Sequence, residues 1–288
     1  MPELPEVEAL AADLRTRLSG RAIARVDIAA FSALKTFDPP LSALHGALLD
    51  DVRRHGKFLD VEASGLHLVV HLSRAGWIRW RDEVPKLPPK PSNKSPLAAR
   101  IVLDDDSGLD ITEAGTQKRL AIYVVQEPSD VPGIARLGPD PLAAEFTRDT
   151  LRSILDAAGR AQLKGVLRNQ GTIAGIGNAY SDELLHAARM SPFKPASSVT
   201  DDDLEILYDA IRTVLGDAVE RSRGLAAAEL KGEKKSHLAV HGRTGEKCPV
   251  CGDTVREVSF ADSSLQYCPT CQTGGKPLAD RRMSRLLK

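Results

Sequence analysis

The sequence lacks several features that would each define a class of protein. No apolar run approaches the roughly 18 to 20 residues that span a bilayer. The N-terminus is acidic and has no apolar core of a signal peptide. Charge of one sign is not in excess, since 39 Lys and Arg balance 39 Asp and Glu. These absences argue against membrane-spanning and secreted classes, and predict a cytoplasmic protein without membrane contact.

Cysteine is missing from the chain until its C-terminal part. There, two Cys-x-x-Cys pairs occur, Cys248 with Cys251 and Cys268 with Cys271. This spacing is typical of a structural zinc site, in which four thiolates complete a tetrahedral shell and leave no position for substrate. The alternatives are two disulfides or four buried thiols, and disulfides do not suit a chain without a secretion signal. Strand-like alternation over 255–260 and a turn-like 261–264 add a β-hairpin, so a ribbon with one structural zinc ion is predicted.

A net charge of zero conceals an uneven distribution. Residues 231–288 hold 11 Lys and Arg but only 6 Asp and Glu, and the rest of the chain is correspondingly acidic. A neutral protein binds nucleic acid if its cations line one groove, although its non-specific affinity should be modest. The positive charge is concentrated in the predicted ribbon and in the tail that follows it.

The first half of the chain reads as β-rich. A helix is expected over 3–18, where Val7, Leu10, Leu14 and Leu18 recur at helical spacing. Many short strands separated by turn signals predict a β-sandwich or flattened barrel. The strands are expected at 22–28, 47–54, 58–63, 67–72, 77–80, 100–103, 109–112 and 120–125.

The second half reads as helical. Helices are expected over 143–158, 163–168, 177–188 and 201–222, whereas 224–239 shows no clear period. The sequence therefore predicts an α+β protein with an N-terminal β-sandwich flanked by helices, a helical domain and a C-terminal β-hairpin ribbon. The expected boundaries are 1–136 for the sandwich domain, 137–142 for a linker, 143–239 for the helical domain, 240–274 for the ribbon and 275–288 for a basic tail.

The opening residues offer reactive chemistry. Removal of Met1, which is usual before a small residue, would leave Pro2 with a free secondary amine. An α-amine has a reference pKa of about 7.7 to 8, so a useful fraction is unprotonated at neutral pH. Such an amine condenses with an aldehyde to a cationic imine, and Glu3 stands beside it as a possible proton donor or acceptor. The alternative is that Pro2 and Pro5 only stiffen the N-terminus.

Residues 164–195, with Gly175-Ile176-Gly177-Asn178 at their centre, resemble the helix-two-turns-helix of the formamidopyrimidine-DNA glycosylase and endonuclease VIII family. The opening Pro-Glu-Leu-Pro-Glu-Val-Glu is similar to the formamidopyrimidine branch. The likeness continues through 55–58, 137–142, 240–243 and the ribbon, and so covers nearly the whole chain. It implies a base-excision-repair enzyme that removes damaged bases from double-stranded DNA and cleaves abasic sites. The implied route is an imine at Pro2 followed by β- and δ-elimination, with Glu3 protonating the sugar ring oxygen.

Further roles are implied only by this resemblance. Lys57 would hold a phosphate beside the lesion and assist proton transfer, which makes the implied catalytic set Pro2, Glu3 and Lys57. The implied DNA-binding set is His71, Arg74, Lys118, Arg119, Lys164 and Asn178. Asn178 lies at an expected helix N-terminus, where backbone N–H groups bind phosphate. It could also be a simple helix cap, and Lys57 an exposed surface lysine.

Four departures from the family pattern concern DNA grip and base reading. Arg74 stands where the family has a wedging Met. Lys118 replaces an Arg that reads the orphaned base, and Leu120 replaces a wedging Phe. Ser263 stands where an Arg grips phosphates, and the stretch 224–240 is shorter than the loop that closes over oxidised guanine. None of these changes touches the implied catalytic residues, so imine chemistry is better supported than any lesion preference.

Two alternatives remain open. The chain could be a non-catalytic damaged-DNA-binding protein on the same fold, or a lyase that acts mainly on abasic or single-stranded sites. An intact Pro2–Glu3 start favours catalysis, because a pure binder has no need of a free amine. The expected enzyme is a nucleoid-associated monomer. Its preferred lesion, its preferred opposite base and the role of its tail are not specified by the sequence.

Overall fold

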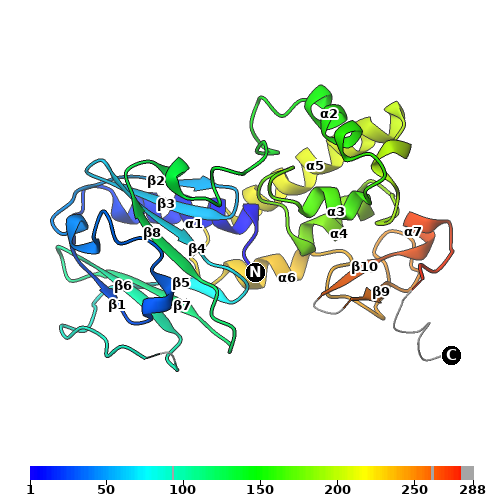
Figure 1. The fold of residues 1–288 in the computed structure, drawn as a ribbon. Helices are drawn as coiled ribbons and strands as arrows, with labels where there is room; N and C mark the ends of the chain where they lie inside the picture. Colours follow the sequence, from blue (N-terminus) through cyan, green and yellow to red (C-terminus); the bar gives the residue numbers. More distant parts are fainter. Residues whose placement is uncertain (93, 261–262, 280–288) are drawn as a thin grey trace. The chain divides into compact units, whose positions relative to one another are not determined.

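The computed structural model describes residues 1–92, 94–260 and 263–279. The chain forms two compact units, which Figure 1 shows as ribbons. The first unit contains 1–136 together with 221–232, and the second contains 137–220 and the residues from 233 onward. The chain therefore enters the first unit twice. The last residues of the predicted basic tail, 280–288, lie outside the described residues.

Helix α1 (Leu4–Leu18) opens the first unit and confirms the expected N-terminal helix. Its buried side chains include Val7, Leu10, Leu14 and Leu18, the positions whose spacing predicted it. The helix packs on β2 (Leu49–His55) and β3 (Phe58–Ala63). It begins at a capped end, described below, that carries the candidate reactive residues.

Two four-stranded antiparallel sheets form the body of this unit. One has the order β1-β6-β7-β5 and the other β2-β3-β4-β8. The remaining strands are β1 (Ile23–Ile28), β4 (Leu66–His71), β5 (Gly76–Arg81), β6 (Leu97–Leu103), β7 (Gly108–Glu113) and β8 (Ala121–Val125). Both sheets and α1 contribute to a single hydrophobic core. All eight predicted strands are confirmed, and so is the predicted α+β class.

Residues 221–232 are held in the first unit by a tryptophan on β5. The buried Trp77 indole N–H donates to the carbonyl oxygen of Ala227 at 2.9 Å. The Lys231 ammonium lies 4.4 Å from the centroid of the same ring, within cation–π distance. Leu230 is fully buried in the core shared by the two sheets. The short segment after α5 is thus an integral part of the first unit.

The helices of the second unit follow the predicted order. They are α2 (Arg148–Ala158), α3 (Leu163–Arg168), α4 (Asn178–Ala187) and α5 (Asp201–Ser222). Helix α2 starts later than expected because the Thr147 hydroxyl accepts the Thr150 N–H at 3.2 Å and caps it there. Helix α6 (Leu230–His237) was not predicted. Leu230 is its one buried residue, so the segment carries no apolar period.

The C-terminal ribbon confirms the predicted hairpin. Strands β9 (Arg256–Ser259) and β10 (Ser264–Tyr267) pair antiparallel, and α7 (Pro269–Thr273) follows them.

Short 3-10 helices lie in connecting segments at Phe31–Ala33, Leu41–Leu44, Pro128–Asp130 and Ala196–Ser198. Among the described residues, no helix combines the length and the apolarity needed to cross a membrane.

Candidate functional site

Pro2 and Glu3 lie at the N-terminal end of α1. The Glu3 carboxylate accepts the backbone N–H of Glu6, and the Glu6 carboxylate accepts the backbone N–H of Glu3 at 2.8 Å. This reciprocal capping box satisfies two donors that a helix start leaves unpaired. Both carboxyl side chains are 2% exposed, and Pro2 is also buried. The helix N-terminus favours negative charge, and the capping box fixes the orientation of the Glu3 carboxylate, which belongs to the residue next to Pro2 in the sequence.

Lys57 and His71 lie close together in the first unit. Lys57 occupies the turn between β2 and β3 and is buried, while His71 ends β4. Residue Phe58 pairs with His71 across the sheet, and their ring centroids are 4.6 Å apart. Burial lowers the pKa of His71 from 6.5 to about 4, and the positive charge of Lys57 adds to the effect. At neutral pH the pair therefore presents one cation, Lys57, beside an uncharged imidazole.

Arg74 is presented by the turn between β4 and β5. Its side chain is exposed, and the preceding Ser73 has a left-handed φ of 54°. The turn closes where the Gly76 N–H donates to the Leu72 carbonyl at 2.8 Å. A Cβ added at Gly76 would lie 2.0 Å from that carbonyl oxygen. Glycine is therefore required at the position that aims Arg74 outward.

The segment between β7 and β8 is organised by Glu113. Its buried carboxylate accepts the backbone N–H groups of Arg119 and Leu120, and its carbonyl accepts the Lys118 ammonium. The side chain of Arg119 is exposed. Leu120 is 2% exposed and belongs to the core. Leu120, which stands where the family has a wedging Phe, therefore uses its side chain in packing.

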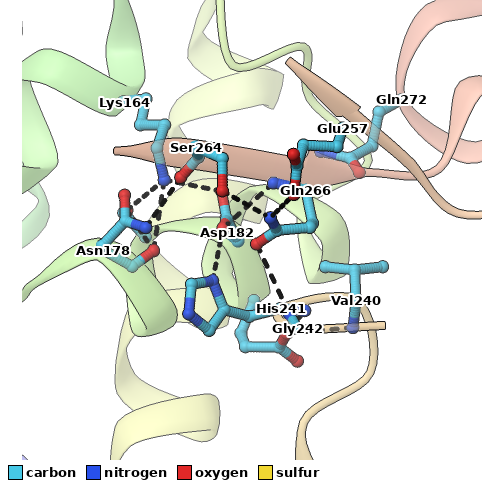
Figure 2. A network of polar contacts seen from close by, with 12 residues as sticks. Lys164, Asn178, Asp182, Val240, His241, Gly242, Glu257, Ser264, Gln266 and Gln272 are labelled. Atoms are coloured by element: carbon cyan, nitrogen blue, oxygen red, sulfur yellow. Dashed lines mark hydrogen bonds and ion pairs between the residues drawn. The ribbon is translucent and has the colours of Figure 1, made fainter. Parts of the chain in front are cut away.

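Lys164 and Asn178 lie side by side in the second unit (Figure 2). The buried Lys164 ammonium donates to the Asp182 carboxylate at 2.6 Å, the Ser181 hydroxyl at 2.8 Å and the Asn178 carbonyl at 3.1 Å. Asn178 begins α4, and its side-chain amide donates to the Ser264 carbonyl at 2.8 Å. Its Oδ1 is buried and has no hydrogen-bond partner among the described residues. Phosphate contact by either residue stays a prediction.

The four cysteines come together in the ribbon. Their Sγ atoms all lie within 4.8 Å of one another. Cys248 and Cys271 are 3.8 Å apart, and Cys251 and Cys268 are 3.3 Å apart. Tetrahedral zinc with Zn–S bonds of about 2.3 Å places its sulfurs about 3.8 Å apart, so the donor set fits the ion. The predicted zinc site is confirmed.

Sequence reasoning missed the polar side chains of α4 that dock the ribbon. The buried Asp182 also pairs with His241 at 2.7 Å. Glu183 accepts the backbone N–H groups of Ala239, Val240 and His241 at 2.6 to 3.0 Å. Burial raises the pKa of Glu183, although these three hydrogen bonds act in the opposite direction. The available signal was the adjacent pair of acidic residues, Asp182 and Glu183, inside the predicted helix.

The sandwich with a capped Pro-Glu start, the helical unit and the four-cysteine ribbon together define the architecture of a DNA-repair glycosylase. Three family models match the chain. The formamidopyrimidine-DNA glycosylase N-terminal domain matches 1–119, its H2TH domain matches 137–228, and the zinc finger found in FPG and IleRS matches 245–274. The chain belongs to the formamidopyrimidine-DNA glycosylase family, which confirms the resemblance seen in the sequence.

Individual relatives agree with this assignment. A formamidopyrimidine-DNA glycosylase of Symbiobacterium thermophilum is 37% identical over 98% of this chain and 93% of its own length. A Mycobacterium tuberculosis protein, named an uncharacterized formamidopyrimidine-DNA glycosylase-like protein, is 61% identical over 53% of this chain and 94% of its own. The crystal structure of MutM (Fpg) from Thermus thermophilus superimposes with a TM-score of 0.80 at 31% identity, over 96% of this chain and 100% of that one. The Lactococcus lactis enzyme bound to DNA containing N7-benzyl-Fapy-dG gives 0.83 at 26% identity, over 94% and 100%.

Proposed function

We propose that this chain, a DNA glycosylase of base excision repair by family, is bifunctional. It releases a damaged base from double-stranded DNA and then cleaves the strand at the resulting abasic site. The proposal assigns nucleophilic catalysis to Pro2, proton transfer to Glu3 and phosphate binding to Lys57. In this proposal the sandwich domain contains the catalytic residues, and the helical domain and ribbon bind the DNA.

The proposed reaction begins on a nucleotide that has left the base stack, because the sugar is not accessible in the duplex. The unprotonated Pro2 nitrogen forms a bond to C1′ as the bond from C1′ to the base breaks, and the base leaves with a proton. The Pro2 nitrogen, which keeps its own proton after the attack, passes that proton to the Glu3 carboxylate. Glu3 then delivers it to the ring oxygen, and the ring opens as the Pro2 lone pair forms a cationic imine. The capping box supports this role, since it orders the carboxylate of the residue that follows Pro2.

Strand cleavage follows from the imine. The cationic nitrogen draws electrons from C1′, so a C2′ proton is lost and the 3′ phosphate departs by β-elimination. A second proton loss expels the 5′ phosphate by δ-elimination, and water then hydrolyses the imine and frees Pro2. A one-nucleotide gap with phosphate at both ends is the expected product.

We assign phosphate binding beside the lesion to Lys57, with His71 as its neighbour. Lys57 is buried and the neighbouring His71 is neutral at neutral pH, and an ammonium forms charge-assisted hydrogen bonds to phosphate oxygens. A charged His71 would repel Lys57. The lowered pKa of His71 removes that repulsion at neutral pH.

The observation that carries the proposal is the intact Pro2–Glu3 start, held by a buried capping box at the head of α1. Mass spectrometry of the purified protein should show that Met1 is removed, since the chemistry requires a free Pro2 amine. Pro2→Gly should lose most cleavage of an abasic duplex. Pro5→Ala, which changes a proline of the same segment without altering the amine, should retain it.

The competing functions predict different results in the same assay. A non-catalytic binder would retain abasic DNA without cleaving it, with or without Pro2. A lyase for single strands would cleave abasic single strands faster than abasic duplexes. Cleavage of the duplex by the Pro2→Gly variant at the wild-type rate would refute the assignment of the nucleophile.

A further inference from the structure

Three polar side chains recur at every fourth position of α4. They are Asn178, Asp182 and His186. Residues spaced by four lie on the same face of an α-helix, one above the other. At a rise of about 1.5 Å per residue, the row extends for about 12 Å along the helix. We call this row the α4 stripe.

Each member of the α4 stripe contacts a different part of the segment that contains the ribbon. Asn178 donates to the Ser264 carbonyl at 2.8 Å. Asp182 accepts the Gln266 backbone N–H at 3.2 Å, and Figure 2 shows both contacts on β10. At the last turn of α4, the Nε2 of His186 lies 3.3 Å from the Sγ of Cys248. The stripe therefore touches the hairpin at two points and a zinc ligand at a third.

When zinc is bound, the direction of the hydrogen bond between His186 and Cys248 is fixed. A zinc-bound thiolate has lone pairs but no proton, so the imidazole must be the donor through Nε2–H. His186 is 5% exposed and Cys248 is 2% exposed, so water does not replace this contact readily. Backbone N–H groups of Val250 and Cys251 also donate to Cys248. Four thiolates around one divalent ion leave net negative charge, which each of these donors stabilises.

We infer that His186 is a positioning residue of the zinc centre. Its Nε2–H holds the Cys248 thiolate in ligating position and fixes the zinc ribbon on α4, in line with Asn178 and Asp182. Occupancy of the zinc site and docking of the ribbon on the helix are thereby coupled through one hydrogen bond. This role does not depend on the proposed imine chemistry.

The test compares two substitutions in the full-length zinc-loaded protein. His186→Gln keeps an N–H donor at a reach close to that of Nε2, whereas His186→Phe keeps a ring but removes the donor. His237→Phe makes the same exchange at an exposed histidine of α6 and serves as the control. Zinc affinity is measured by competition with a chromogenic chelator, and the Co²⁺-substituted proteins report thiolate geometry through their sulfur-to-metal charge-transfer bands.

His186→Phe should weaken zinc binding by about 10-fold or more, the usual effect of losing an outer-shell partner, and should shift the Co²⁺ bands. His186→Gln and His237→Phe should stay close to the wild type. His186→Asn, whose shorter side chain does not reach Cys248, should behave like His186→Phe and replaces it if that variant does not fold. Wild-type zinc affinity in both donor-free variants would overturn the inference. Equal losses in His186→Gln and His186→Phe would do so too, because packing alone would then explain them. The experiment uses no DNA. Its outcome for His186 can therefore be interpreted even if the proposed glycosylase function is wrong.

Discussion

The protonation of His71 should make the first unit sensitive to mild acid. Its pKa is lowered from 6.5 to about 4 by burial and by the nearby Lys57. The unfolded chain therefore binds a proton to this histidine more tightly than the folded chain does. Stability from this source is complete above pH 6.5 and is lost progressively as the pH falls toward 4.

The magnitude follows from the shift. Between about pH 7.5 and about pH 5, the unfolded histidine becomes mostly protonated while the folded one stays mostly neutral. The linkage relation gives a loss of about 2 kcal/mol over this interval, which rises to about 3 kcal/mol below pH 4. A domain is typically stable by about 5 to 15 kcal/mol, so the loss is measurable.

Urea unfolding at the two pH values measures this loss. Both tryptophans of the chain, Trp77 and Trp80, belong to the first unit, so their fluorescence reports that unit. His71→Gln should lose about 2 kcal/mol less than the wild type on acidification. His45→Gln, at an exposed histidine of the same unit, should keep the wild-type loss. If wild type and His71→Gln lose equal stability, the account of a half-buried neutral imidazole is wrong.

Three further predictions concern the metal, the phosphate contact and base choice. Cys268→Ser should reduce zinc to well below one ion per chain by metal analysis and lower DNA affinity, while the tryptophan fluorescence of the first unit stays native. Lys57→Ala should slow cleavage of an abasic duplex by about 10-fold or more and reduce the salt dependence of binding. Lys86→Ala, in the loop before β6, should change neither the rate nor the salt dependence. Equal cleavage rates for the two variants would contradict the phosphate role of Lys57. With Arg74 at the wedge position and Lys118 at the base-reading position, excision of 8-oxoguanine should be slow relative to abasic cleavage and poorly selective for the opposite base, because an ammonium lacks the bidentate fork of arginine. Fast excision opposite cytosine with strong rejection opposite adenine would contradict this reading.

Much of the fold could be predicted because local patterns and tertiary contacts agree. The row of apolar residues in α1 and the period-2 strands specify which faces are buried, so element type follows directly. Helix α6 shows where this fails. Only Leu230 is buried along it, so it has no apolar face to detect. Its first residues are held through Trp77, which lies far away in the sequence.

Some features of the candidate site could likewise be predicted from the sequence, and others could not. The metal-binding cysteine pairs could be predicted, because their chemistry is visible in residue type and spacing, whereas the role of Pro2 stays a prediction. The burial of individual side chains could not be predicted from the sequence. Lys164 reads as a free cation in the sequence, yet its ammonium is paired with Asp182 inside the second unit. Leu120 stands at the family's wedge position in the sequence but lies in the core. Such outcomes depend on which distant residues meet, which no local pattern contains.

The central claim is that the Pro2 nitrogen becomes bonded to the sugar. The most direct test is to reduce the mature protein with borohydride while it acts on an abasic duplex, digest the cross-linked product and locate the sugar remnant by tandem mass spectrometry. Reduction fixes an imine as a stable amine, so the account predicts a remnant on the N-terminal peptide at Pro2. A remnant found on a lysine side chain, or trapping undiminished in a protein whose N-terminal amine is blocked, would contradict it.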